Sequence, residues 1–126
     1  RAWIEFSSSL FNAQHQLTQA RREETYLKIE EDFTKKLAPL ERKIGNDGFF
    51  EGKKFSLVDS AFAPFLMRSQ IVADNIGIDP VSDYKKISKW RANLLSLPEV
   101  QKSVVKNFDD LYMEGIFERG GYLADQ

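Results

Sequence analysis

The 126-residue chain offers few side chains that catalyse reactions or hold metal ions. It contains one histidine, His15, and no cysteine. A histidine-based metal site or a serine–histidine–aspartate triad would therefore depend on His15 alone. Neighbouring apolar residues place His15 on the polar side of a predicted helix, which favours an ordinary surface histidine. Without cysteine there is no disulfide, thiolate ligand or cysteine nucleophile within this segment. We assign no catalytic residue and no metal ligand.

Two acidic clusters and the glycines give no stronger indication of catalysis. The clusters are Glu23-Glu24 and residues 30–32, and lysines surround them in the sequence. Charges of both signs on one helix are typical of a solvated face with pairs four residues apart, rather than of a catalytic carboxylate pair. No glycine-rich stretch has the spacing of a phosphate-binding loop.

Arg68 is the charged residue with the best claim on a ligand. It is the only charge between Ser60 and Ala73. A charge on an apolar helix must find a partner or water. One interpretation is a salt-bridged arginine, or one whose long stem reaches solvent. The other places its guanidinium at the edge of a ligand cleft, where it would meet a carboxylate in a two-pronged contact.

The helix that carries Arg68 has a clear start and an apolar surface. Ser56 and Asp59 have the spacing of an N-capping box, in which each side chain meets the other residue's backbone N–H. From Leu57 to Leu66 only Asp59 and Ser60 are polar, so the helix is expected at the centre of the protein. Pro64, inside it, removes one backbone hydrogen bond and is expected to bend it.

Apolar residues recur at helical spacing through most of the chain, and no alternating strand pattern is present. The predicted helices cover residues 2–19, 24–45, 56–75 and 80–97, with a shorter one near 100–108 and a tail at 109–126. Pro39 is expected to kink or break the second of these. The fold class is therefore all-α, a bundle of about five helices plus a C-terminal tail.

Composition indicates one soluble globular domain over residues 1–126. Hydrophobic residues make up 42% of the chain and charged residues 29%, and the formal charge is −1. That balance argues against nucleic-acid binding, and the longest apolar run is too short to span a membrane. No signal peptide is recognised, which fits a cytoplasmic protein. Because the chain opens in helical pattern without methionine, we expect it to be a piece of a longer protein.

Several of these features together resemble the C-terminal domain of glutathione S-transferases. They are Ser56-Leu-Val-Asp59, Ala63-Pro64 and Arg68, the Gly48–Gly52 loop, the opening Arg-Ala-Trp-Ile-Glu-Phe, and Trp90 followed by Leu97-Pro98-Glu-Val. The similarity covers about residues 1–108, with matching order and spacing. The omega class and its bacterial relatives look closest, because they place proline and arginine as here and carry a C-terminal extension.

The resemblance implies a protein of two domains. An N-terminal thioredoxin-like domain would bind glutathione, which is one of the two co-substrates, and would hold the catalytic serine, tyrosine or cysteine. The helical domain would supply the wall for a hydrophobic small molecule, which is conjugated or undergoes thiol exchange, as in detoxification, and the full-length protein would be a homodimer. This chain departs from the family pattern in lacking the thioredoxin-like segment. It would therefore bind no cofactor by itself.

The resemblance also assigns binding roles, each with ordinary packing as its alternative. Phe6, Leu10 and Phe11 would line the pocket for the hydrophobic co-substrate. Arg68 would hold an anionic group of that molecule, and Tyr112 and Phe117 would cover the cleft. We expect the first helix and the tail to expose an apolar patch for the missing domain. Two other interpretations stay open: a non-catalytic interaction or regulatory module with the same fold, and an unrelated helical bundle.

Overall fold

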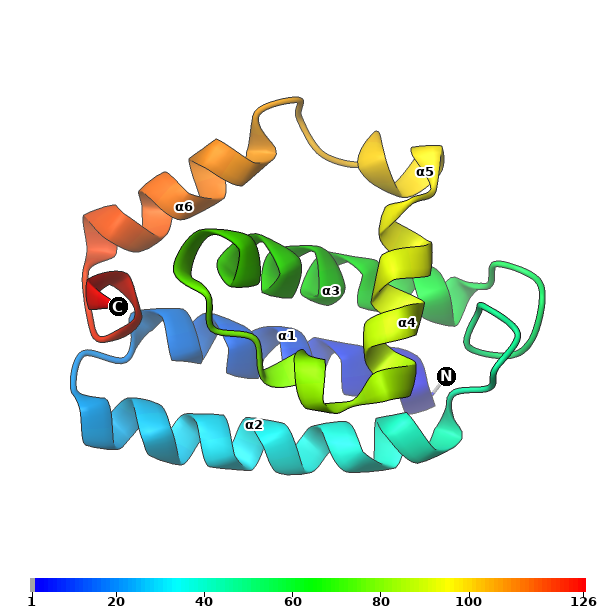
Figure 1. The fold of residues 1–126 in the computed structure, drawn as a ribbon, viewed down its shortest axis with the longest axis horizontal. Helices are drawn as coiled ribbons and strands as arrows, with labels where there is room; N and C mark the ends of the chain where they lie inside the picture. The colour runs from blue at the N-terminus through cyan, green and yellow to red at the C-terminus, as the bar shows by residue number, and fades with distance from the viewer. Residues whose placement is uncertain (1) are drawn as a thin grey trace.

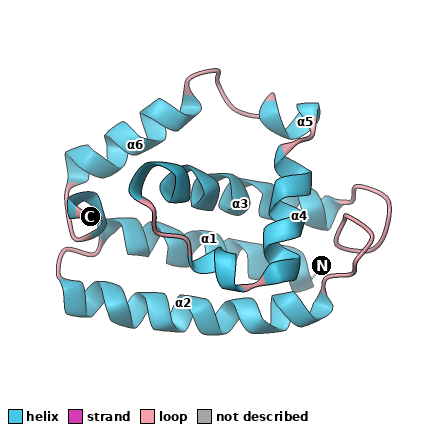
Figure 2. Ribbon diagram, in the orientation of Figure 1, coloured by secondary structure: helices cyan, strands magenta, loops and turns pink. Residues whose placement is uncertain are grey.

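The computed structural model describes residues 2–126 and is built of helices. Arg1, the first residue of the stretch that resembles the family's first helix, lies outside the described residues. The elements are α1 (Ala2–Gln19), α2 (Glu23–Lys43), α3 (Leu57–Ile76), η1 (Pro80–Asp83), α4 (Lys85–Leu95), α5 (Pro98–Gln101), α6 (Phe108–Arg119) and η2 (Leu123–Asp125). Figure 2 shows only helices and loops across this range. The all-α prediction is confirmed.

The helices are arranged around α3. In Figure 1, α1 and α2 run side by side in opposite directions, α3 lies along α1, and α4 crosses α3 steeply. After the short α5 the chain passes over the top and returns as α6, whose far end meets the turn between α1 and α2. No helix among residues 2–126 is long and apolar enough to cross a lipid bilayer.

Helix α3 is buried on nearly all sides, as its composition predicts. The consecutive residues Phe65, Leu66 and Met67 are all buried, and Phe62 is fully enclosed. Successive helical residues point about 100° apart, so consecutive buried side chains require neighbours on several sides. The helix continues through Pro64. Helix α2 likewise continues through Pro39, so the alternative of a break there is wrong.

The buried carboxylate of Asp59 joins three segments. Its Oδ2 accepts from the Ser56 backbone N–H at 2.8 Å and from the Ser56 hydroxyl at 2.9 Å, within the predicted capping box. Its Oδ1 accepts from the Phe50 N–H and from the Trp90 indole N–H, both at 2.8 Å. Asp59 is 0% exposed. A single side chain thus starts α3, holds the preceding loop and fixes α4.

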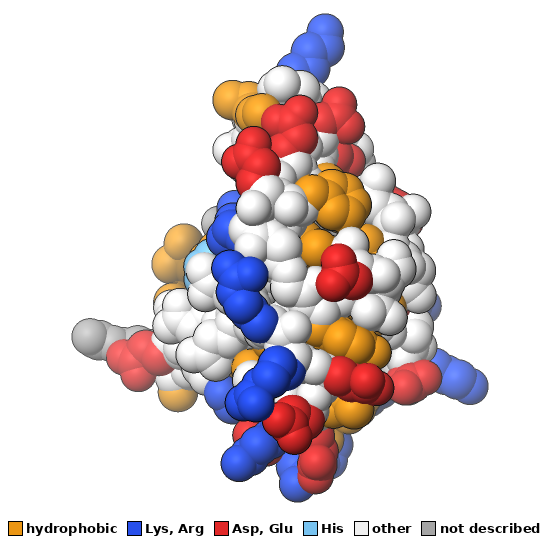
Figure 3. All heavy atoms as spheres, turned by 90° about the vertical axis from the view of Figure 1, so that its left-hand side faces the viewer, with side chains coloured by type: hydrophobic (Ala, Val, Ile, Leu, Met, Phe, Trp, Pro, Cys, Tyr) orange, Lys and Arg blue, Asp and Glu red, His pale blue; other side chains and the backbone are white. Residues whose placement is uncertain are grey.

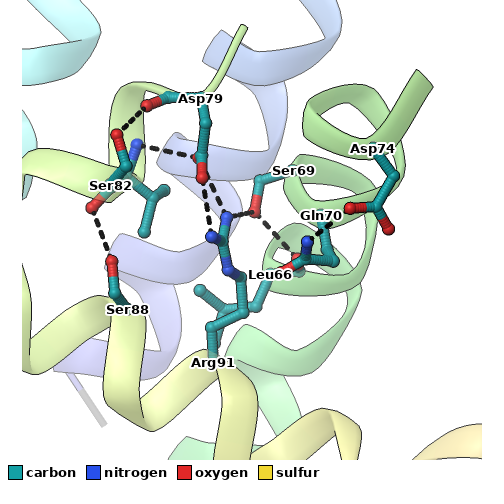
Figure 4. A network of polar contacts seen from close by, with 9 residues as sticks. Leu66, Ser69, Gln70, Asp74, Asp79, Ser82, Ser88 and Arg91 are labelled. Carbon is teal, nitrogen blue, oxygen red and sulfur yellow. Dashed lines mark hydrogen bonds and ion pairs between the residues drawn. The ribbon is translucent and has the colours of Figure 1, made fainter. Parts of the chain in front are cut away.

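A second buried polar group holds the connection from α3 to α4. The Arg91 guanidinium makes a two-pronged contact with Asp79, at 2.9 and 2.7 Å, and a third bond to the Ser69 hydroxyl at 3.1 Å. Figure 4 shows Arg91 reaching from α4 between Asp79 and Ser69. Bidentate geometry and satisfied donors are the conditions under which a buried ion pair is tolerated.

The predicted helix at 80–97 is divided in the structure. The first part is the 3₁₀ turn η1, and α4 begins only after Tyr84. The carboxylate of Glu41, on α2, accepts from the N–H groups of Lys86 and Ile87 at 3.0 and 2.9 Å. These are among the first, unpaired N–H groups of α4, so a residue distant in sequence sets where this helix begins.

The C-terminal part is more regular than predicted. The helix expected near 100–108 is limited to Pro98–Gln101, and the residues from Phe108 onward form the 12-residue helix α6. Asp109 and Asp110 occupy the first turn of α6 and Arg119 the last, which suits the helix dipole. The tail therefore contains a sixth α-helix.

Hydrogen bonds to backbone carbonyls attach the end of α6 to the turn between α1 and α2. The Tyr122 N–H donates to the Ala20 carbonyl at 2.9 Å, and Arg21 Nη2 donates to the Arg119 carbonyl at 3.1 Å. Gly121 adopts φ +118°, and a Cβ there would lie 2.7 Å from the Ala20 oxygen. Only glycine allows both this conformation and this close approach.

The Asp59 contacts give a first prediction. In Asp59→Asn, the amide replaces an oxygen that accepts from buried donors, so at least one of them loses its partner. We expect the free energy of unfolding to fall by about 3 kcal/mol. Urea denaturation followed by circular dichroism measures it, with Asp83→Asn on the exposed part of η1 as the control. A change below about 1 kcal/mol would show that Asp59 does not organise the fold.

The C-terminal attachment gives a second prediction. Gly121→Ala should destabilise the chain by roughly 2 kcal/mol, because of its positive φ and its clash with the Ala20 carbonyl. The matched control is Gly45→Ala, at a position where a Cβ meets no atom within 4 Å. Thermal unfolding and amide hydrogen exchange of α6 report the effect. Equal behaviour of the two variants would contradict the attachment.

Candidate functional site

A hollow of about 360 Å³ opens between α1, α3 and α6, around Arg68. Helix α1 contributes one side, α3 contributes Arg68, and α6 contributes the other side. The lining residues are Phe11, Asn12, His15, Arg68, Leu111, Tyr112, Gly115 and Arg119. Figure 3 shows the end of the molecule where α6 meets the α1–α2 turn, a face on which basic, acidic and apolar side chains are intermixed.

Aromatic rings hold the Arg68 guanidinium. Its central carbon lies 4.9 Å from the centroids of the Phe11 and Phe108 rings and 5.6 Å from that of Tyr112. Phe108 and Tyr112 stack with centroids 5.9 Å apart. These distances are within the range of cation–π attraction. The guanidinium is thus held by rings from two other helices.

Three helices place these groups by simple spacing. Arg68 lies one turn beyond Pro64, and its Nη1 donates to the Pro64 carbonyl at 3.0 Å. On α6, residues 108, 112, 115 and 119 recur at spacings of 4, 3 and 4, which puts them on one face of the helix. Phe11 lies on α1 between the buried Leu10 and the exposed Asn12. The hollow thus forms where the half-buried edges of α1, α3 and α6 meet.

The hollow is cationic. Its charged lining residues are Arg68 and Arg119, and no aspartate or glutamate lines it. The ion pairs found among residues 2–126 are Arg22–Glu24, Lys35–Glu31 and Arg91–Asp79, so neither lining arginine belongs to one. The salt-bridged interpretation of Arg68 is therefore wrong, because it packs on aromatic rings instead.

Burial changes the acid–base properties of two lining groups in opposite directions. Partial burial lowers the pKa of Arg68, because desolvation penalises its charge. Burial raises the pKa of Tyr112, while the positive charges of Arg68 and Arg119 partly oppose that rise. Arg68 is therefore a cation without a negatively charged partner among residues 2–126, and Tyr112 is a phenol that keeps its proton.

The structure brings together three of the six residues predicted to bind a ligand. Phe11, Arg68 and Tyr112 all line the hollow. Leu10 is 0% exposed and packs in the core, so it presents no surface to a ligand. Phe6 is half-buried against Trp3, with ring centroids 5.4 Å apart. Phe117 is 55% exposed on α6 and does not line the hollow.

Sequence reasoning missed five lining residues: Asn12, His15, Leu111, Gly115 and Arg119. His15, predicted at the surface, is exposed and also lines this hollow. The helical spacing of Phe108, Tyr112 and Arg119 is the signal for the lining residues on α6, but the glycines and acidic residues of the tail suggest an irregular segment. Arg119 is the most informative of them, because it adds a second cation.

A neighbouring hollow of about 560 Å³ has the opposite character. It lies between α3 and the start of α6, and its lining includes Phe108, whose ring packs against Arg68. Asp74, Asp109 and Asp110 line it together with one lysine, Lys106. No group of three or more potential metal-binding side chains comes together within residues 2–126.

The arrangement around Arg68 can bind a ligand, and we assign it no bond-breaking step. It offers ring faces, an apolar edge at Leu111 and two guanidinium groups. Its hydroxyl, on Tyr112, belongs to a phenol of raised pKa, which is a poor nucleophile at neutral pH. Flat molecules with a negative charge match this chemistry.

Comparison with known proteins gives one match. The family described as "Glutathione S-transferase, C-terminal domain" matches residues 5–98. The match is to the family as a whole and lends no support to the omega class in particular. No curated protein and no solved structure matches the chain. Helix α6, with half of the residues that line the hollow, lies beyond the matched range.

The raised pKa of Tyr112 predicts how stability responds to alkaline pH. The unfolded chain loses this proton first, near pH 10, so the stabilising contribution is complete below about pH 10 and is lost as the pH rises towards the folded-state pKa. As the pH rises above about 10, the free energy of unfolding should therefore fall less in Tyr112→Phe than in the unaltered chain. Urea denaturation at a series of pH values measures this, and parallel curves would contradict it.

Proposed function

The chain belongs to the glutathione S-transferase C-terminal domain family, and we propose that it forms the wall that binds a hydrophobic, aromatic co-substrate. The observation that carries this proposal is the hollow between α1, α3 and α6, where Arg68 stacks on Phe11, Phe108 and Tyr112. Ring surface of this kind suits a flat apolar molecule, and a guanidinium orients one that carries an acceptor.

In this proposal the reaction takes place in a thioredoxin-like domain that is N-terminal in the full-length protein. That domain would hold glutathione, whose thiolate attacks an electrophile or enters thiol–disulfide exchange. The helical domain contributes binding energy and orientation, and we assign no catalytic residue to it. A cytoplasmic location and a homodimer remain predictions.

Exposed apolar side chains support a second domain packed on this one. On α6, Leu111 and Phe117 are exposed, and Phe55 and Leu57 are exposed at the start of α3. On α1, Trp3, Ile4 and Phe6 are only partly buried. Large apolar side chains gathered on the surface are a feature of interfaces. The apolar patch expected on the first helix and the tail stays a prediction, because the exposed side chains of this kind lie on α6 while those of α1 are partly buried.

The test uses the full-length protein and two assays. Conjugation is followed with 1-chloro-2,4-dinitrobenzene, and thiol exchange with a glutathione mixed disulfide. Phe11→Ala removes a ring from the hollow and should raise the KM for the aromatic substrate roughly fivefold, with the KM for glutathione unchanged. The matched control is Leu27→Ala, an exposed apolar residue on α2, which should change neither constant.

The possible results separate the interpretations. Turnover with the expected change in one KM supports the co-substrate wall. Turnover that Phe11→Ala leaves unaltered places the substrate elsewhere and contradicts the proposal. Absence of both activities in the folded full-length protein would favour the alternative of a non-catalytic interaction or regulatory module.

A further inference from the structure

We propose that the hollow selects aromatic anions, with Arg68 and Arg119 together binding a carboxylate and the rings of Phe11 and Tyr112 binding the aromatic part. The inference rests on the proposed function and narrows its ligand class. It adds a second cation, Arg119, that lies outside the range matched by the family. The argument depends on free donors, on charge balance and on how the two side chains are held.

Within the described part of the chain, most of the N–H groups of the Arg68 guanidinium are free to donate hydrogen bonds to a ligand. A guanidinium carries five N–H groups and has no acceptor. Within residues 2–126, one hydrogen bond of this guanidinium is found, from Nη1 to the Pro64 carbonyl. The rings that pack around it restrict its motion before any ligand arrives, so a ligand need not supply that ordering free energy.

Arg119 extends back along α6 towards the same place. Its Nη1 lies 3.3 Å from the position that a Cβ on residue 115 would occupy, which puts its guanidinium over Gly115. Gly115 therefore leaves the room through which Arg119 reaches the hollow. The Arg119 backbone is fixed in turn by the bond from Arg21 Nη2 to its carbonyl.

The charges of the protein do not neutralise this pair. The eight lining residues include no carboxylate, and neither arginine takes part in an ion pair within the described range. The acidic side chains of Asp109 and Asp110 line the neighbouring hollow instead. Both arginines line the same hollow, and a bound anion would supply the negative charge that the lining residues lack.

An aromatic anion satisfies both halves of the hollow at once. Its carboxylate receives charge-assisted hydrogen bonds, which are stronger than neutral ones, in a partly desolvated setting. Its ring lies against the apolar and aromatic lining. A neutral aromatic of the same shape gains only the second contribution and leaves the arginines without a partner. The expected selectivity between the two is roughly tenfold in Kd.

The experiment compares 2-naphthoate with 2-naphthamide, which has the same ring system and no charge. The 126-residue chain is labelled with ¹⁵N and titrated with each compound, because amide shifts report both the Kd and the location. We expect roughly tenfold tighter binding of the naphthoate, with the largest shifts around residues 11, 68, 112, 115 and 119.

Three variants identify the cation. Arg119→Gln should remove most of the preference for the anion, so that the two Kd values agree within about twofold, and Arg119→Lys should keep part of it. Arg42→Gln makes the same change of net charge on an exposed position of α2 and should leave the preference intact. Since Arg119 is exposed, its replacement should not unfold the chain.

Each outcome decides the inference. Equal Kd values in the unaltered chain, shifts located elsewhere, or an unchanged preference in Arg119→Gln would overturn it. If both compounds bind equally at the hollow, the anion selectivity fails while the proposed co-substrate wall stands. If neither compound shifts these residues, the proposed wall fails as well.

Discussion

The buried Asp59 carboxylate is the interaction on which the rest of the structure depends. Its two oxygens are shared among the start of α3, the Phe50 backbone and the Trp90 indole. Burying a carboxylate costs free energy unless hydrogen-bond donors satisfy its oxygens. Here each donor comes from a segment whose position is set by that bond. The position of α4 and the shape of the loop before α3 therefore follow from one side chain. The rings of Phe50, Phe62 and Trp90 pack against one another.

Local chemistry made α1, α2 and α3 predictable from the sequence. Ser56 and Asp59 specify the start of α3, and the apolar spacing of α2 persists through Pro39. The boundaries that were missed depend on distant partners. Helix α4 begins where Glu41 caps it from α2, and the segment before it is held by Asp79 and Arg91. A prediction from local periodicity has no access to such contacts.

The candidate site was predictable to a similar extent and for similar reasons. Arg68 stood out because a lone charge on an apolar helix requires an explanation. Phe11 and Tyr112 were proposed with it, and the three meet in one hollow. Leu10 was not distinguishable from Phe11 by residue type, since burial of neighbouring positions depends on how helices pack. Arg119 was missed because α6 combines glycine with acidic residues, a composition typical of loops as well as of helix starts.

The attachment of α6 has a consequence for how such a protein can evolve. Its far end is held through the backbone carbonyls of Ala20 and Arg119 and by the close approach of Gly121. Carbonyl groups are present whatever the side chain, so this attachment places little demand on the residues of α6 that face the hollow. Those residues can change by mutation while the core around Asp59 keeps its sequence. The core around Asp59 can therefore preserve the fold, while the residues of α6 that face the hollow are free to change which ligand is bound.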